Sequence, residues 1–361
     1  MAAADPAADE ALADLAARIS EASAAGEPLA VRGGGSKDFL GHAVDGAELG
    51  TGACRGIVAY EPSELVVTAR AGTPLAEVEA ALAAEGQILA FEPPRLAADS
   101  TIGGAVAAGL SGPARPFRGA LRDYVLGCRV LDGRGRTLTF GGQVMKNVAG
   151  YDVSRLLAGS MGCLAVLTEV SLKVLPTPAA TTTLARECGD AEAIRIMCRL
   201  AGQPLPLSAA SHADGVLRLR LSGAAGAVAA AERSLRQSLG GEESGGGHWE
   251  ALRDQRDGVF STSLPLWRLS VPPATLPLAL PGRQLVDWAG AQRWLATDAD
   301  AERVRAAAAA AGGHATRYRG GDDAVPAFHP LPDALLSLHR RLKSALDPAG
   351  IFNPDRMYGG L

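Results

Sequence analysis

The sequence predicts an α+β fold, and three observations lead to this class. Amphipathic helices and short strands are mixed along the chain without the regular alternation of a doubly wound parallel sheet. The DGRG turn at 132–135 separates two strand-like runs, which is typical of an antiparallel hairpin. The composition changes near 176–180, where two prolines end a strand. We therefore expect a domain boundary there in the chain of 361 residues.

The individual elements follow from apolar spacing and from the residues that start and stop them. Residues 7–24 place Leu12, Leu15 and Ile19 on one helical face, and Gly26 ends that helix. Thr73 is the expected N-cap of a helix that begins at Pro74 and ends near Gly86. The other predicted helices cover 154–158 and 332–346. The predicted strands cover 28–32, 56–60, 65–69, 125–131, 137–140 and 164–175.

Composition and charge exclude several classes of protein. Hydrophobic residues make up 47% and charged residues 20%, so the chain can bury a core and is not disordered. The net charge of −4 offers no basic surplus for binding nucleic acid. The five cysteines form no C-x-x-C pair, which argues against a zinc site or an iron–sulfur cluster. There is no apolar run of membrane-spanning length and no signal peptide, so we expect a cytoplasmic protein.

Two glycine-rich segments in the first half have the chemistry of a phosphate site. RGGGSK occupies 32–37, directly after a predicted strand, and STIGG occupies 100–104. Consecutive glycines let backbone N–H groups converge on one anion, and nearby hydroxyl and ammonium groups would complete a diphosphate site. The alternative is a tight turn that binds nothing. Neither the P-loop pattern nor the Rossmann pattern G-x-G-x-x-G is present, so a dinucleotide would be held in another way.

A set of motifs, in this order, resembles a known flavoprotein family. They are RGGGSKDFLG, EPSELVVTARAGTPLAEVEAALAAEGQ, DSTIGGAVAAGLSG, FRGALRDYVLGCRVLDGRGR, MKNVAGYDVSRLLAGSMGCLAVLTEVSLKVLP and LDPAGIFNPDRMY. Together they resemble the FAD-binding domain of the vanillyl-alcohol oxidase / p-cresol methylhydroxylase (PCMH) superfamily. Within it, the chain is most similar to the FAD-binding E subunits of glycolate oxidase (glycolate dehydrogenase). The similarity covers 27–178 and the C-terminal arm.

The resemblance implies a domain plan and a cofactor. The plan is a two-lobed PCMH-type FAD-binding domain at 1–178, an antiparallel-sheet cap domain at 179–328, and a C-terminal helix and arm at 329–361 that return to the FAD domain. Ser36 stands where relatives with covalent flavin carry histidine, so the FAD is expected to be non-covalent. Ala165 replaces a usual glycine, which requires a negative φ there. The implied FAD-binding residues are Arg32, Gly33, Gly34, Gly35, Ser36, Lys37, Ser100, Thr101, Gly103, Gly104, Gly109, Ser111, Gly112, Arg118, Gly119, Gly162 and Val166.

The resemblance also implies an activity and partners. The chain is expected to be a subunit of a complex that oxidises glycolate, a small 2-hydroxy acid, to glyoxylate. Electrons would pass through flavin to an iron–sulfur subunit, beside a second flavin subunit, and the complex would associate peripherally with the inner face of the membrane. The alternatives are a free-standing FAD-dependent 2-hydroxy-acid dehydrogenase and a non-catalytic scaffold with structural FAD. The histidine-rich metal motif of catalytic relatives, H-x-x-D-G-N-x-H, is missing, so we expect no metal and favour a helper role.

Candidate catalytic residues are few. Flavin oxidation of a hydroxy acid needs a cation for the carboxylate and a base for the hydroxyl proton. Arg268 and Arg293 lie on presumed cap strands and are candidate cations, although either would also suit a solvated strand position or an ion pair. Tyr151 is a candidate near the flavin. Asn353 and Arg356 in the C-terminal arm either return to the flavin or simply mark the stop of the preceding helix.

Overall fold

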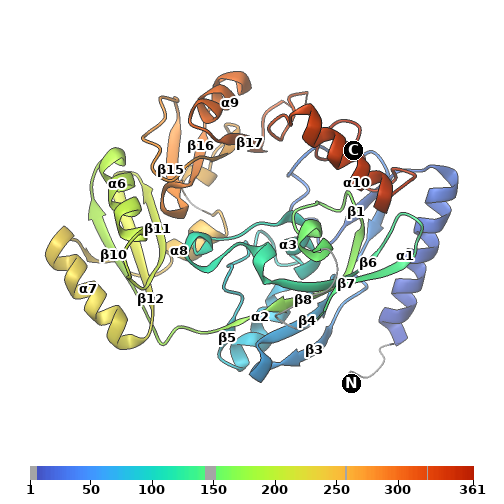
Figure 1. Cartoon of the computed structure of the whole chain (residues 1–361), viewed down its shortest axis with the longest axis horizontal. Helices are drawn as coiled ribbons and strands as arrows, with labels where there is room; N and C mark the ends of the chain where they lie inside the picture. Colours follow the sequence, from blue (N-terminus) through green and yellow to red (C-terminus); the bar gives the residue numbers. More distant parts are fainter. Residues whose placement is uncertain (1–5, 143–151, 257, 323) are drawn as a thin grey trace. The chain divides into compact units, whose positions relative to one another are not determined.

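The computed structural model describes residues 6–142, 152–256, 258–322 and 324–361, and it shows two compact units (Figure 1). The first unit contains the chain up to Leu110 together with Ala120–Pro176 and Pro330–Leu361. The second contains Ser111–Gly119 and Thr177–His329. The units therefore divide at Pro176, and the short Ser111–Gly119 segment belongs with the second one. Helices and antiparallel sheets are mixed in both units, so the α+β prediction is confirmed.

The first unit is built on a five-stranded antiparallel sheet in the order β3-β4-β8-β6-β7. Its strands are β3 (Ile57–Glu61), β4 (Val66–Arg70), β8 (Val166–Lys173), β6 (Val125–Leu131) and β7 (Thr137–Gly141). Two pairs of short strands add to it: the parallel pair β1 (Leu29–Arg32) and β2 (Ala47–Gly50), and the antiparallel pair β5 (Gln87–Ile88) and β9 (Leu175–Pro176). The helices are α1 (Pro6–Ala25), α2 (Leu75–Ala84), α3 (Ile102–Ala108), α5 (Val153–Leu157) and α10 (Asp333–Leu346).

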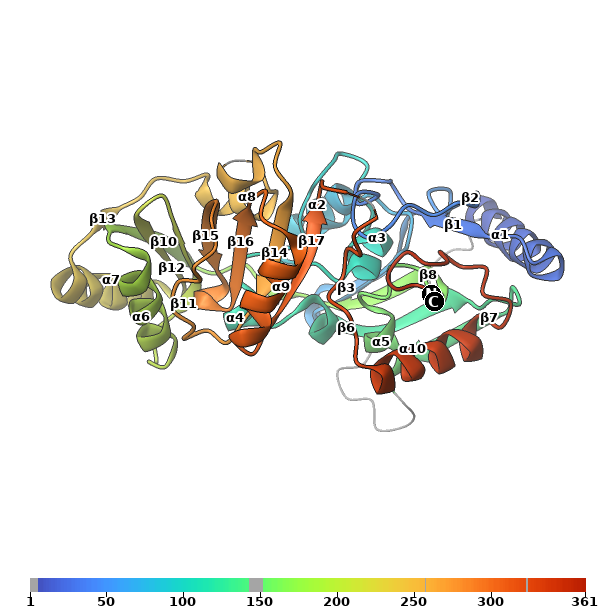
Figure 2. The same cartoon turned by 90° about the horizontal axis from the view of Figure 1, so that it is seen from above.

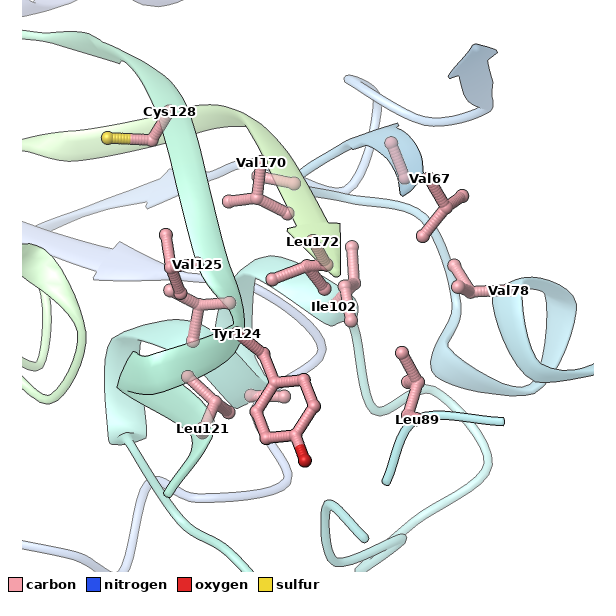
Figure 3. Close-up of a cluster of buried hydrophobic side chains, with 14 of the residues drawn as sticks. Val67, Val78, Leu89, Ile102, Leu121, Tyr124, Val125, Cys128, Val170 and Leu172 are labelled. Atoms are coloured by element: carbon pink, nitrogen blue, oxygen red, sulfur yellow. The ribbon is translucent and has the colours of Figure 1, made fainter. Parts of the chain in front are cut away.

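The core of the first unit lies where α2 and α3 cover one face of this sheet. Figure 3 shows Val67 from β4, Val78 from α2, Ile102 from α3 and Leu172 from β8 converging on one cluster. Tyr124 closes the cluster, and its ring lies 5.3 Å from that of Phe91. The small residues of α3 let this helix approach the sheet closely, which fixes the position of its first turn.

The second unit is an eight-stranded antiparallel sheet in the order β13-β10-β12-β11-β15-β16-β14-β17 (Figure 2). Its strands are β10 (Ala180–Glu187), β11 (Leu207–Ala213), β12 (Val216–Gly223), β13 (Glu242–Glu243), β14 (Leu266–Ser270), β15 (Arg283–Asp287), β16 (Gln292–Ala296) and β17 (His314–Arg319). Apolar residues of α6 (Asp190–Ala201) and α7 (Ala225–Leu239) pack on one part of this sheet, and those of α9 (Ala301–Ala310) on another. Two short helices, α4 (Arg115–Arg118) and α8 (His248–Arg253), complete the unit.

One predicted helix start differs in the structure. Pro74, in an extended conformation, precedes α2, and no side chain caps the helix. Thr73 instead accepts a hydrogen bond from the Gly56 N–H at 2.9 Å and donates its own hydrogen toward a carbonyl oxygen, that of Arg70 lying 2.7 Å away. The hydroxyl is therefore used to join two strand ends, because a buried polar group takes whichever partners the fold brings closest.

The C-terminal arm is attached to the first unit by a buried ion pair. Lys343, near the end of α10, lies 2.8 Å from the Asp347 carboxylate, and both side chains are nearly inaccessible to solvent. Lys343 also donates hydrogen bonds to the carbonyl oxygens of Cys163, at 2.8 Å, and Phe352. Asp347 accepts from the backbone N–H groups of Ile351 and Phe352. The pair thus joins the helix, the arm and the segment before β8. Among the described residues, no helix has both the length and the apolar character to cross a membrane.

The substitution Lys343→Met is expected to lower the free energy of unfolding by about 3–5 kcal/mol, because it leaves the Asp347 carboxylate buried without its counter-ion. Urea denaturation followed by fluorescence measures the change. Arg341→Met is the matched control, since Arg341 is an exposed residue of the same helix. Equal urea midpoints for the two variants would contradict a stabilising role for the buried Lys343–Asp347 pair.

Candidate functional site

The first unit contains an open pocket where the loop after β1 meets the start of α3. Its volume is about 700 Å³, including space open to solvent. The loop Arg32–Asp38 forms one wall, α3 a second, and the segment before β8 a third. The lining residues are Val31–Asp38, Thr51, Ala71, Thr101, Gly103, Gly104, Ala107, Ala108, Met161, Gly162, Ala165, Leu167 and Arg356.

The wall after β1 needs glycine because its backbone touches other backbone. A Cβ on Gly34 would overlap the carbonyl oxygen of Asp99. A Cβ on Gly33 would lie 2.6 Å from the hydroxyl oxygen of Thr101. Gly35 has a φ of +71°, a left-handed conformation that glycine adopts without strain. Gly33 and Gly34 therefore bring this loop against the turn that precedes α3, while Gly35 gives the loop its left-handed bend.

The start of α3 is held by hydroxyl groups. Thr101 caps the helix, since its side-chain oxygen accepts from the Gly104 N–H at 3.0 Å. The Ser100 hydroxyl, which is buried, bonds to the hydroxyl of Ser36 at 3.0 Å and so links the two glycine-rich segments directly. Gly103 lies so close to Ala71 that a Cβ would be 2.5 Å from the methyl carbon of that alanine. The two segments thus form one rigid wall.

The charges around the pocket are not all neutralised. Arg32 forms ion pairs with Asp38 at 2.6 Å and Glu48 at 3.0 Å, and these partners raise its pKa. Lys37 has no such close partner among the described residues: its ammonium reaches the Ser36 hydroxyl at 3.3 Å, and its side chain is only 8% exposed. Burial lowers the pKa of Lys37 to about 8, although the charge of Asp99 opposes this shift. Lys37 is therefore a buried cation that an anion in the pocket would stabilise.

A second cation reaches the pocket from the C-terminal arm. Arg356 donates to the backbone carbonyl oxygen of Lys37 at 3.3 Å, while its Nε is buried without a hydrogen-bond partner in the described structure. Burial lowers the pKa of this guanidinium. Asn353, fully buried, fixes the arm nearby, since it accepts from the Val31 N–H at 2.8 Å and donates to the Met161 carbonyl oxygen at 2.7 Å. The unpartnered donor fits a negatively charged ligand.

The sequence-predicted residues divide into several groups. The pocket brings together Arg32, Gly33, Gly34, Gly35, Ser36, Lys37, Thr101, Gly103, Gly104 and Gly162. Ser100 lies behind the wall, and Gly109 ends α3 in a left-handed conformation. Val166 is fully buried in a different apolar cluster, because neighbouring residues of a strand point to opposite faces and Ala165 and Leu167 take the pocket side.

Four further predicted residues, Ser111, Gly112, Arg118 and Gly119, belong to the second unit. The carbonyl oxygen of Gly112 accepts from the indole N–H of Trp288 at 3.0 Å, and Arg118 donates to the carbonyl oxygen of Ser222 at 3.3 Å. These contacts join the Ser111–Gly119 segment to β12 and to the turn that follows β15. None of the four residues lines the pocket of the first unit.

Several lining residues were missed by the sequence analysis. Ala71, Ala107 and Met161 lie within the quoted motifs but were not singled out there, and Thr51 lies outside all of the motifs. Arg356 could be anticipated from the sequence, because the C-terminal arm was expected either to return to the flavin or to mark the stop of the preceding helix. Ala165 has a negative φ, so the methyl group that replaces the usual glycine causes no backbone strain.

The two candidate catalytic arginines do not act together. Arg268 pairs across the strands with Trp294, whereas Arg293 pairs with Leu269, so the two side chains leave opposite faces of the sheet. Arg293 is buried and donates to the carbonyl oxygens of Gly290 and Thr275, which gives it a structural role. Burial lowers its pKa to about 10. The Arg268 guanidinium lies over the ring of Tyr318 at 5.7 Å. Tyr151 lies outside the described residues.

The donor set of the pocket suits a phosphate-bearing cofactor. Backbone N–H groups of a glycine loop, the hydroxyls of Ser36 and Thr101, and the cations Lys37 and Arg356 surround one space. The described residues contain no group of three or more His, Cys, Asp or Glu side chains placed to hold a metal ion.

Comparison with known proteins agrees with this chemistry. A family model described as an FAD binding domain matches residues 9–141. The glycolate oxidase subunit GlcE of Escherichia coli (strain K12) is 49% identical over 347 residues, covering 96% of this chain and 97% of that protein. The glycolate oxidase subunit GlcD of Bacillus subtilis (strain 168) is 41% identical over 85 residues, covering 24% and 18%. A solved alkyldihydroxyacetonephosphate synthase shares the fold, with a TM-score of 0.68 and 15% identity over 95% of this chain and 74% of that one.

These findings confirm the resemblance inferred from the sequence motifs. They also confirm FAD as the cofactor, which the donor set of the glycine-lined pocket fits. The chain belongs to the family of the glycolate oxidase subunit GlcE.

Proposed function

We propose that the chain is an FAD-binding subunit of a glycolate oxidase and takes part in the oxidation of glycolate to glyoxylate. The observation that carries this proposal is a glycine-walled pocket with two incompletely paired cations, in a chain that is 49% identical to GlcE over nearly its whole length. Bound FAD supplies a two-electron acceptor for the hydride on the α-carbon of a 2-hydroxy acid.

The pocket residues have separate proposed roles in holding FAD. Gly33–Gly35 would present backbone N–H groups to the diphosphate, with Lys37 and Arg356 balancing its charge. The apolar side chains of Met161 and Leu167 would contact the ring systems. Ser36 offers no nucleophile of the histidine or cysteine type, which supports a non-covalent cofactor.

The proposal includes two partner subunits. An iron–sulfur subunit is needed to carry electrons onward, because the described cysteines are scattered and no cluster of them suits such a centre. A second flavin subunit would supply metal-assisted substrate chemistry, for which the described residues of this chain offer no cluster of ligands. In the second unit Arg268 is the arginine still suited to hold a carboxylate, since the hydrogen bonds of Arg293 go to backbone carbonyls.

The purified chain is expected to show flavin absorbance that moves to the supernatant after acid precipitation. In the assembled complex, anaerobic glycolate should bleach the flavin, while acetate, which has no hydroxyl group to oxidise, should not. A colourless chain that FAD cannot reconstitute would contradict the proposal, as would a complex whose flavins ignore glycolate. Bleaching of the isolated chain would favour the free-standing dehydrogenase instead.

Gly34→Ala is expected to weaken FAD binding at least tenfold, because the new Cβ overlaps the Asp99 carbonyl oxygen and displaces the loop. Gly52→Ala is the matched control: its Cβ would meet no atom within 4 Å, and its φ is not positive. Flavin fluorescence titration of the apoprotein gives both dissociation constants. If the two variants bind FAD equally well, the loop is not part of the site.

FAD affinity is expected to fall as the pH rises above about 8. The pKa of Lys37 is about 8 without ligand, so above this value binding of the diphosphate must first take up a proton. The dissociation constant should therefore rise by up to tenfold per pH unit between pH ~8 and ~9.5. Lys37→Met should bind more weakly at pH ~7 and lose this dependence; an unchanged pH profile in that variant would exclude Lys37 as its source.

A further inference from the structure

The second unit contains a separate pocket that the proposed function does not use. Its volume is about 1270 Å³, including space open to solvent. The hairpin between β11 and β12, the start of β15 and the helix α8 surround it. Its charged and titratable lining residues are Asp214, Arg218, His248, Arg256 and Arg283.

The positive charges of this pocket exceed the negative ones. Both carboxylate oxygens of Asp214 accept from the Arg283 guanidinium, at 2.7 and 3.3 Å, so this aspartate is already paired. Arg283 first, and then the charge of Arg218, lowers the pKa of Asp214, which therefore stays ionised at neutral pH. Among the residues that the structure describes, no hydrogen bond or ion pair reaches the half-buried guanidinium of Arg218.

Arg256 is also poorly compensated. Among the described residues, the carboxylate that pairs with its guanidinium belongs to Asp254, with an oxygen 3.9 Å away. That carboxylate already accepts two hydrogen bonds from Arg253, at 2.7 and 2.8 Å. Within the part of the chain that the structure describes, Arg218 and Arg256 therefore bring two positive charges to one pocket, and the carboxylates near them, Asp214 and Asp254, are already bonded to Arg283 and Arg253.

His248, which also lines the pocket, lies near these arginines. Its Nε2 lies 3.0 Å from the hydroxyl oxygen of Ser211, which is buried on β11. Burial above all, and then the charge of Arg218, lowers the pKa of His248 to about 4, while the charge of Glu250 opposes this shift and that of Arg220 adds to it. The ring is therefore neutral at pH ~7 and adds hydrogen-bonding capacity to the pocket without adding charge.

The rest of the lining fits an organic molecule of small size. Leu252, Phe260 and Leu285 give the pocket an apolar side that would contact a carbon skeleton. Gly246 and Gly247 leave open space, since a Cβ on either would meet no atom within 4 Å. Guanidinium groups bind carboxylate and phosphate oxygens through paired hydrogen bonds.

We propose that this pocket binds a small organic anion with at least two negative charges, either a polycarboxylate or an organic phosphate, held by Arg218 and Arg256. Glycolate carries a single carboxylate, so this ligand is distinct from the proposed substrate. The inference does not depend on the proposed oxidation, because none of its residues belongs to the glycine-walled pocket.

Isothermal titration calorimetry on the FAD-loaded chain tests the proposal, with the cofactor pocket filled and ionic strength held constant. Citrate is the polycarboxylate probe, and inorganic pyrophosphate is the phosphate probe. We expect saturable binding of at least one, and the tighter of the two identifies the ligand class. Arg218→Gln and Arg256→Gln should each raise its dissociation constant about tenfold, the effect of one charge-assisted hydrogen bond.

Arg233→Gln is the matched control, because it makes the same change in net charge at an exposed position on α7 outside the pocket. It should leave the dissociation constant within about twofold. If Arg218→Gln fails to fold, Arg256→Gln still decides the question, since the Arg256 side chain is 60% exposed. Absence of saturable binding for both probes, or equal weakening in the control, would overturn the proposal.

Discussion

The close approach of two backbone segments is the constraint on which the cofactor pocket depends. Gly34 touches the backbone of Asp99, and Gly33 lies against the side chain of Thr101, so the loop and this turn are in direct contact. This contact brings Ser36 against Ser100, sets the Lys37 ammonium in a buried position, and leaves the start of α3 facing the same space. Since backbone groups in such contact have little room to move, the donors are arranged before any ligand arrives, which reduces the entropy lost on binding.

The same pocket obtains part of its charge from the opposite end of the chain. Lys343 and Asp347 anchor the arm, Asn353 bonds to both Val31 and Met161, and Arg356 then reaches the carbonyl oxygen of Lys37. A buried ion pair gains little stability compared with an apolar pair, yet it selects one arrangement because its alternatives leave a charge without a partner. We interpret Lys343–Asp347 as a device that fixes where Arg356 lies.

The local signals in the sequence predicted much of the fold and one wall of the site. Glycine runs, turns and apolar alternation act over a few residues, so the strands of the five-stranded sheet and the RGGGSK loop were predictable, whereas the short strands β2 and β5 were not predicted. The geometry that depends on residues far apart in the sequence could not be predicted in this way. Val166 and Ala165 differ by one residue, and only the strand's orientation decides which of them faces the pocket. Arg268 and Arg293 looked equivalent in sequence, but the pairing register of β14 and β16 sends them to opposite faces.

The discontinuous make-up of the first unit has a consequence for biosynthesis. Its sheet is complete in sequence by Pro176, yet α10 and the arm follow only after the whole second unit. At ordinary rates of translation, the time between the synthesis of Pro176 and that of the arm is on the order of ten seconds or more. During that time the nascent chain carries a glycine-walled loop without Asn353 to brace it and without Arg356 to balance an anion. The pocket therefore gains its full set of charges only once Pro330–Leu361 has been made, and until then the apolar residues that Ile351 and Phe352 cover are exposed to aggregation.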